Sequence, residues 1–309
     1  MGKGIGYGKT ILFGEMFAIL GVPVIASALS MTADAEVVRT GSGGWEVEDE
    51  RQEAKGYKEE KKAMQTESLG KIFQHLGFRP EHMRIRLGGD LPAMSGIGAT
   101  GASSVAIVRA LSEEFHLGLT DEEVNTAAFQ GETAYHGPTT SGIDNMISTY
   151  GGVISLIRGE PNVVRKMRLR EPVEVVIGDT GIIANTKVLL GAFAERRKKY
   201  PDQYERILQQ ARQIAAEAMT RIEAFDLSQI GSLMNRNQDL LQEAGISCPE
   251  LDVLVDLSRR AGALGAKLTG SGGGGCMIAL TPGKDLQEKV ASAIEAKGFQ
   301  AFPSKLGVN

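Results

Sequence analysis

The chain has 309 residues, of which 42% are hydrophobic and 23% charged, with 39 glycines and 10 prolines. This length predicts about two domains, and the composition excludes a disordered or collagen-like chain. A formal net charge of -4 leaves no overall basic surface for nucleic acid or anionic lipid. We therefore expect no nucleic-acid partner, and an anionic ligand would need a local binding site.

Cysteine usage and apolar runs indicate the cellular setting. Cys248 and Cys276 are far apart in the sequence, without the spacing of a disulfide framework or a zinc site. The longest apolar stretch, residues 18–29, contains Gly21 and Pro23 and is too short and interrupted to span a bilayer. Because the N-terminus also lacks a signal-peptide pattern, we expect a cytoplasmic protein without a membrane partner.

The first half of the chain shows alternating strand and helix patterns. The glycine-rich run 2–8 precedes two apolar segments, 11–20 and 22–29, which predict strands. The charged stretch 41–62 predicts a solvated loop and the exposed face of a helix. The further predicted elements are a helix through 69–76, a strand at 83–87, a helix at 102–115, and a helix at 121–135 that Thr120 caps with Glu123 three residues on.

The second half also mixes strands and helices. Short strands are predicted between 152 and 188, and the polar connection 158–170 is the expected domain boundary. The remaining predicted elements are helices at 198–225, 227–244 and 248–262, a strand, glycine-rich turn and strand over 266–280, and a closing helix at 286–297. Since no repeat period is present, the pattern predicts a mixed α and β fold in two halves.

Two glycine-rich segments in the first half of the chain differ in what they predict. Gly8-Lys9-Thr10 ends like a P-loop, but Lys3 stands where the partner glycine should be, so that motif is not expected. Residues 90–104 lead directly into a predicted helix. Unpaired backbone N–H groups, the helix dipole and nearby hydroxyls make such a helix start suitable for polyphosphate. An ordinary capped helix after a flexible turn remains the alternative.

A third glycine-rich segment, 267–277, lies between two apolar strands and has five glycines among residues 270–275. Ordered glycine costs backbone entropy, so the run indicates close approach of a ligand or another backbone, with a flexible hairpin turn as the alternative. Both this segment and residues 96–101 match GxGxxG, which leaves a dehydrogenase as a minor hypothesis.

Two carboxylates stand between these segments. Glu132 ends a predicted helix and Asp144 follows a Ser-Gly turn. Brought together near bound phosphates, they could hold Mg²⁺ and orient a substrate hydroxyl. Helix capping and an Asx turn would explain the same residues equally well from composition alone.

Taken together, these segments resemble the GHMP kinases, and the mevalonate kinases are the nearest members. The segments that carry the resemblance, in chain order, are 7–16 (YGKTILFGEM), 90–104, 141–145 (SGIDN), 178–187 and 269–276. The resemblance implies an α+β, two-domain GHMP kinase fold. Its N-terminal domain, 1–165, would contain a left-handed βαβ unit, and its C-terminal domain, 166–309, would be ferredoxin-like.

The resemblance also implies an enzyme, an ATP-dependent kinase that phosphorylates a small-molecule alcohol, with mevalonate to mevalonate 5-phosphate as the expected reaction and ATP and Mg²⁺ as cofactors. Its implied catalytic residues are Asp144 and Lys9. ATP would contact Met94, Ser95, Gly96, Ile97, Gly98, Ala99, Thr100, Gly101, Gly272 and Gly273. Thr100 and Glu132 would hold the metal, and the acceptor would contact Glu15, Met16, Ser141 and Thr186.

Met16 departs from the family pattern, because mevalonate kinases have a histidine at this position that faces the substrate. A GHMP kinase for another small hydroxylated metabolite therefore stays open, as does a non-catalytic homologue that binds nucleotide. Relatives of this kind are commonly dimeric, so a homodimer is a further partner to consider.

Overall fold

The computed structural model describes residues 1–309 except 42, 78, 80–81 and 138–139. The chain forms two compact units with interleaved sequence. Unit 1 comprises residues 1–9, 28–94 and 98–151, and unit 2 comprises residues 10–27, 95–97 and 152–309. Within the described part of the chain, no helix has both the length and the apolar character that crossing a membrane requires.

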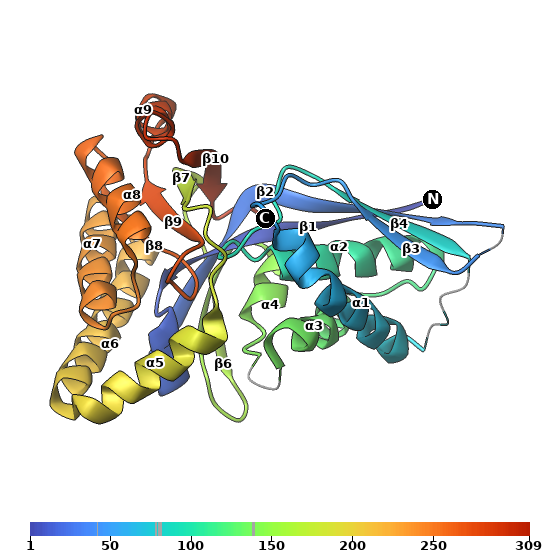
Figure 1. Ribbon diagram of the computed structural model, residues 1–309, viewed down its shortest axis with the longest axis horizontal. Helices are drawn as coiled ribbons and strands as arrows, with labels where there is room; N and C mark the ends of the chain where they lie inside the picture. The colour runs from blue at the N-terminus through green and yellow to red at the C-terminus, as the bar shows by residue number, and fades with distance from the viewer. Residues whose placement is uncertain (42, 78, 80–81, 138–139) are drawn as a thin grey trace. The chain divides into compact units, whose positions relative to one another are not determined.

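Unit 1 is a sheet covered on one face by helices (Figure 1). Its strands come from β1 (Gly2–Phe13), β2 (Val24–Arg39), β3 (Trp45–Asp49) and β4 (Met83–Gly88), and its helices are α1 (Tyr57–His75), α2 (Ala99–Glu114), α3 (Asp121–His136) and α4 (Ile143–Tyr150). β4 pairs in parallel with β3 and antiparallel with β2, which also pairs with β1. Apolar side chains such as Val37, Ile85 and Val108 form the core between sheet and helices.

The N-terminal glycines determine how closely β1 approaches α2. A Cβ on Gly2, Gly4 or Gly6 would lie 2.1–2.2 Å from a backbone oxygen of α2, a distance that real Cβ atoms do not reach. The alternating glycines thus let the strand lie directly on the helix, which carries part of the predicted phosphate-binding segment. The predicted cap of α3 is confirmed as a full capping box between Thr120 and Glu123.

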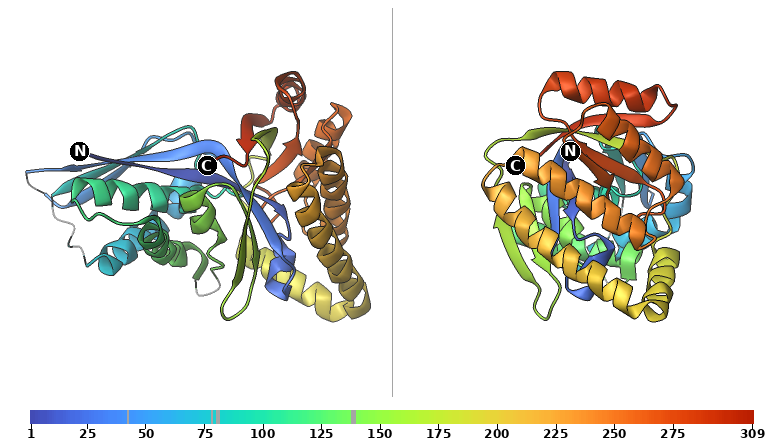
Figure 2. Two further views of the ribbon diagram at one scale, coloured as in Figure 1. Left: turned by 180° about the vertical axis from the view of Figure 1, so that it is seen from behind. Right: turned by 90° about the vertical axis from the view of Figure 1, so that its left-hand side faces the viewer.

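Unit 2 has a second sheet, in the antiparallel order β10-β7-β9-β8. The strands of unit 2 that follow residue 152 are β5 (Val153–Ile157), β6 (Val163–Met167), β7 (Val173–Asp179), β8 (Gly265–Leu268), β9 (Cys276–Leu280) and β10 (Gln300–Leu306). β5 and β6 pair with each other, and β5 also pairs with β2. Its helices are η1 (Met16–Leu20), α5 (Thr186–Lys199), α6 (Pro201–Glu223), α7 (Leu227–Glu243), α8 (Pro249–Arg260) and α9 (Lys284–Glu295). α7 and α8 pack on β8, while α9 packs on β7 and β10 (Figure 2).

Several predicted elements need correction. The apolar segment 11–20 is strand only as far as Phe13, because Gly14 turns the chain with φ +95° and residues 16–20 form η1. The charged stretch 41–62 contains β3, whose backbone pairs with β4, where a loop was predicted. The polar connection 158–170 contains β6, which forms a hairpin with β5. The predictions also missed α5 and β10, while the mixed α+β fold class is confirmed.

Candidate active site

Unit 1 brings Lys9 and Asp144 into direct contact, with Lys9 Nζ 2.7 Å from Asp144 Oδ1. Lys9 lies on β1 and is buried, whereas Asp144, in the first turn of α4, keeps a quarter of its side chain exposed. α4 begins after Gly142, which adopts φ +79°. An ion pair with one buried and one accessible member can bind a polar group at its open side.

Two glycines at the start of α2, the N-cap Gly98 and Gly101 in the first turn, make room for this pair. A Cβ on Gly98 would lie 2.8 Å from Lys9 Cβ, and one on Gly101 would lie 3.1 Å from Asp144 Cβ. Gly98 also has φ +70°, in the left-handed region that favours glycine. The absence of a side chain at Gly98 and Gly101 therefore lets the start of α2 lie close to both charged residues.

Glu132 and Thr100 lie beside the same pair. Thr100 Oγ1 donates to Glu132 Oε2 at 3.4 Å, and Glu132 is fully buried. Burial raises the pKa of Glu132 to about 8, and the Asp144 carboxylate adds to the rise, while Thr100 and Lys9 oppose it. A cation near these oxygens would favour the charged form of Glu132. Since carboxylate and hydroxyl oxygens are the donors that Mg²⁺ prefers, the residues present fit that ion.

The predicted phosphate-binding segment begins at Met94, which is buried, and ends in the first turn of α2. Gly98 is the N-cap of α2 and has no side chain to accept a hydrogen bond from the first helical turn. The first N–H groups of α2 are consequently available to an anion. Residues 95–97 belong to unit 2, so the segment passes from one unit to the other along the chain.

In unit 2, residues 95–97 lie against the glycine-rich loop 270–275. A Cβ on Gly270 would be 3.0 Å from Gly96 Cα, and one on Gly275 would be 3.0 Å from Ser95 O. Gly272 and Gly273, both predicted to contact ATP, have φ of +80° and +65°. The expected close approach is thus explained by one backbone segment lying on another.

Thr186 and Ser141, both predicted at the acceptor site, lie at helix starts in different units. Thr186 Oγ1 donates to Ser271 Oγ at 3.0 Å, which ties the start of α5 to the glycine-rich loop. Ser141 Oγ accepts from the backbone N–H of Ile143 at 3.4 Å, just before Asp144. Ser141 therefore lies just before the helix that contains Asp144, and Thr186 lies beside the glycine-rich loop that contains Gly272 and Gly273.

A buried ion pair holds Glu15. Lys267 Nζ donates to Glu15 Oε1, Asn237 Nδ2 donates to Glu15 Oε2 at 2.9 Å, and the Lys267 and Glu15 side chains are fully buried. Burial lowers the pKa of Lys267, while the charge of Glu15 opposes the shift. Met16, the next residue, is also buried. The sequence reasoning missed Lys267 and Asn237. The available signal for one of them was a charged residue, Lys267, at the end of an apolar predicted strand, three positions before the glycine-rich loop 270–275.

A cavity of about 250 Å³ opens in unit 1 beside the start of α2. Its lining includes Thr100 and Ser103 from α2, Tyr135 from α3, and Arg51 and Lys58 from the segment that was predicted to be solvated. The cavity therefore adjoins the hydroxyl and backbone groups that were predicted to bind phosphate and metal.

The chain is similar to known proteins over most of its length. The N-terminal GHMP kinase domain model matches residues 62–152, and the C-terminal GHMP kinase model matches residues 215–300. A mevalonate kinase of Pyrococcus horikoshii is 33% identical, covering 94% of this chain and 91% of its own length. A mevalonate kinase of Arabidopsis thaliana is 32% identical over 76% of this chain and 65% of its own.

Solved structures include a similar protein over almost the whole chain. The structure of L. major mevalonate kinase in complex with R-mevalonate has a TM-score of 0.93 and 36% identity, covering 99% of this chain and 96% of that one. Lactococcus lactis galactokinase has a TM-score of 0.72 at 17% identity, a likeness of fold alone. The predicted resemblance to this family is confirmed.

Proposed function

Because the chain belongs to the GHMP kinases, we propose that it transfers the γ-phosphoryl group of ATP to mevalonate, giving mevalonate 5-phosphate and ADP. The observation that supports mevalonate as the substrate is the 36% identity, over nearly the whole chain, to a mevalonate kinase whose structure was solved with R-mevalonate. The ion pair of Lys9 and Asp144 supports the chemistry, since kinases use a carboxylate to orient the acceptor hydroxyl and positive charge to stabilise the transition state.

In this proposal, Asp144 accepts a hydrogen bond from the mevalonate hydroxyl and takes up its proton. The hydroxyl oxygen forms a bond to the γ-phosphorus while the bond between that phosphorus and the departing ADP oxygen breaks. Lys9 stabilises the negative charge that develops on the attacking oxygen. Because phosphoryl transfer is largely dissociative, orienting the hydroxyl contributes more than the basicity of Asp144.

The nucleotide would bind along the segment 94–101 and the loop residues Gly272 and Gly273. The free N–H groups of the first α2 turn offer hydrogen bonds to the phosphates, and the adjoining cavity has room for more of the nucleotide. Thr100 and Glu132 would hold Mg²⁺, which when bound supplies positive charge to the β- and γ-phosphates.

The acceptor would lie against Met16, Ser141 and Thr186. Glu15 was predicted to contact the acceptor, but its carboxylate is fully buried and bonded by Lys267 and Asn237. We therefore propose that Glu15 supports the turn before Met16 instead of contacting the acceptor. Met16 replaces the family's polar histidine with an apolar side chain, so the pocket holds mevalonate with fewer hydrogen bonds.

The test is ADP release from Mg·ATP in the presence of mevalonate, mevalonate phosphate, homoserine, galactose or glycerate, each at matched concentration. We expect selective turnover of mevalonate. Turnover of another alcohol with no detectable turnover of mevalonate would contradict mevalonate as the substrate but would leave the proposed kinase chemistry unaffected. ATP binding without turnover on any acceptor would overturn the catalytic proposal.

A further inference from the structure

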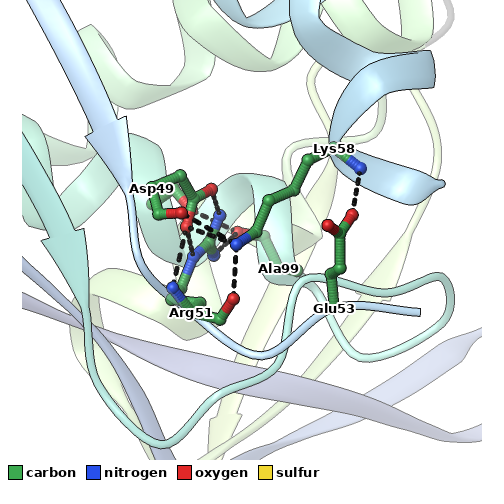
Figure 3. Close-up of polar contacts among 6 residues, drawn as sticks. Asp49, Arg51, Glu53, Lys58 and Ala99 are labelled. Atoms are coloured by element: carbon green, nitrogen blue, oxygen red, sulfur yellow. Dashed lines mark hydrogen bonds and ion pairs between the residues drawn. The ribbon is translucent and has the colours of Figure 1, made fainter. Parts of the chain in front are cut away.

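A cluster of charged side chains, formed by the buried Arg51 and the partly buried Asp49 and Lys58, connects the end of β3 and the start of α1 with the start of α2. Arg51 donates through Nε to Asp49 Oδ1 at 2.9 Å and through Nη2 to Asp49 Oδ2 at 2.7 Å (Figure 3). Lys58 Nζ donates to the backbone oxygen of Asp49 at 2.8 Å and to that of Arg51. Only 5% of the Arg51 side chain is exposed, so its guanidinium has a fixed orientation.

The remaining arm of Arg51 reaches α2. Its Nη1 donates to the backbone oxygen of Ala99 at 3.3 Å, as Figure 3 shows. Ala99 is the first residue of α2 and immediately precedes Thr100. Ser103 Oγ donates to the same oxygen at 2.6 Å, so the carbonyl of Ala99 is held from the helix and from the charged segment together.

The same segment also holds the other end of the predicted phosphate loop. Ala93 N donates to Gln52 O at 2.7 Å, and Ala54 N donates to Ala93 O at 3.1 Å. Ala93 lies just before the loop and Ala99 just after its glycines. Residues 51–54 therefore fix the backbone on both sides of the loop, at Ala93 through main-chain bonds and at Ala99 through Arg51.

The arrangement requires arginine at position 51. A planar guanidinium can bind both oxygens of a carboxylate and still direct a further N–H group toward a third acceptor. A lysine ammonium at this position would keep the positive charge but could not reproduce the three directed bonds. Burial tends to raise the pKa of Asp49, but its bonds to Arg51 and the charge of Arg51 lower it on balance, which keeps the pair ionised.

We propose that Arg51 is a positioning residue for nucleotide binding, which acts through the Ala99 carbonyl to fix the first turn of α2 against the phosphates of ATP. The proposal rests on the proposed function only in taking Mg·ATP as the ligand of this turn. Asp49 orients Arg51, and Lys58 secures the backbone from which both side chains extend.

The experiment compares Arg51→Gln with Arg84→Gln as a matched control. Arg84, on β4, also bonds a carboxylate, Glu46 at 2.6 Å, but it is half exposed. Binding of the Mg²⁺ complex of a non-hydrolysable ATP analogue is measured by calorimetry, and KM is measured separately for Mg·ATP and for mevalonate. We expect Arg51→Gln to raise the analogue's Kd and the KM for Mg·ATP about tenfold, with the KM for mevalonate unchanged. Arg84→Gln should match the wild type.

Two further variants separate positioning from folding and from charge. Asp49→Asn with Arg51→Gln leaves no unpaired buried carboxylate, so it keeps the test valid if the single variant unfolds, and it should show the same rise in Kd. Arg51→Lys keeps the charge and should also bind the analogue weakly. Wild-type affinity in the double variant, or full affinity in Arg51→Lys, would overturn the proposal.

The outcomes also distinguish this inference from the proposed function. If the wild type binds the analogue but does not phosphorylate mevalonate, the proposed function fails, while the loss of affinity in Arg51→Gln still supports the role of Arg51. If the wild type phosphorylates mevalonate and Arg51→Gln retains its Kd, the role of Arg51 fails alone.

Discussion

Lys9 Nζ and Asp144 Oδ1 lie 2.7 Å apart, although β1 and α4 place the two residues at opposite ends of the unit 1 sequence. The contact depends on the start of α2, because Gly98 lies against Lys9 and Gly101 against Asp144. The two residues that are proposed to act in catalysis thus pack against the start of the helix that is also proposed to bind phosphate.

The first prediction concerns this pair. Asp144→Asn keeps the size of the side chain but removes the negative charge that pairs with Lys9 and orients the hydroxyl, together with the ability to take up a proton. We therefore expect kcat to fall about 10²- to 10⁴-fold. Affinity for the Mg²⁺ complex of the ATP analogue should change little. Steady-state kinetics and calorimetry on one preparation measure both quantities, and a kcat equal to that of the wild type would refute the role of Asp144.

A second prediction addresses Met16. Met16→His restores a polar group where the family has one, and an added hydrogen bond of about 1 kcal/mol would raise kcat/KM for mevalonate about threefold to tenfold. The KM for Mg·ATP should stay constant and serves as the internal control. An unchanged kcat/KM would argue against contact between position 16 and the acceptor.

The third prediction concerns the buried pair of Lys267 and Glu15. Lys267→Met leaves the Glu15 carboxylate buried without its cation and should lower the free energy of unfolding by about 3–5 kcal/mol. Adding Glu15→Gln to this variant should recover much of that loss. Denaturant unfolding measures both, with Lys198→Met as control because Lys198 and Glu195 form an exposed pair. A loss below about 1 kcal/mol would show that the pair is dispensable.

The fourth prediction follows from Asp179, at the end of β7. Burial raises the pKa of Asp179, and a backbone hydrogen bond from Gly181 opposes the shift. The folded state therefore binds this proton more tightly than the unfolded state does. As the pH rises from the ordinary pKa of an aspartate to the raised pKa of the folded state, the ionisation of Asp179 lowers the free energy of unfolding progressively.

Asp179→Asn removes that titration, so its stability relative to the wild type should increase between pH 4 and pH 7. Unfolding free energies of both proteins at the two pH values give the difference, in which the effects of other ionisable groups cancel. A constant difference, or one that falls with pH, would contradict the assigned environment.

Local patterns in the sequence predicted much of the fold. The capping box of α3 and the periodic apolar faces of α6 and α7 depend on neighbouring residues, so they were visible without the structure. β3 was missed because its sequence is charged and it forms a strand only by pairing with β4, which is distant in the sequence. In the sequence, the glycine-rich run 2–8 was noted only as preceding the first predicted strand. In the structure it is part of β1, and its glycines permit close packing on α2.

Those residues of the candidate site that lie in recognisable sequence motifs could be predicted. Lys9, Thr100, Glu132 and Asp144 stood in recognisable segments, and unit 1 brings them together. Arg51 and Lys267 lay outside this reasoning, because their significance comes from burial and from contacts with distant parts of the chain. Arg51 bonds the backbone oxygen of Ala99, and Lys267 pairs with Glu15. A charged residue in a polar stretch is usually solvated, and only the three-dimensional contacts show the exception.

The most direct test of the account identifies the product. Wild-type enzyme with Mg·ATP and R-mevalonate should form ADP and mevalonate 5-phosphate in equal amounts, followed by ³¹P NMR, and Asp144→Asn should form neither at a comparable rate. Absence of the 5-phosphate with wild-type enzyme that binds Mg·ATP, or its equal formation by Asp144→Asn, would contradict the account.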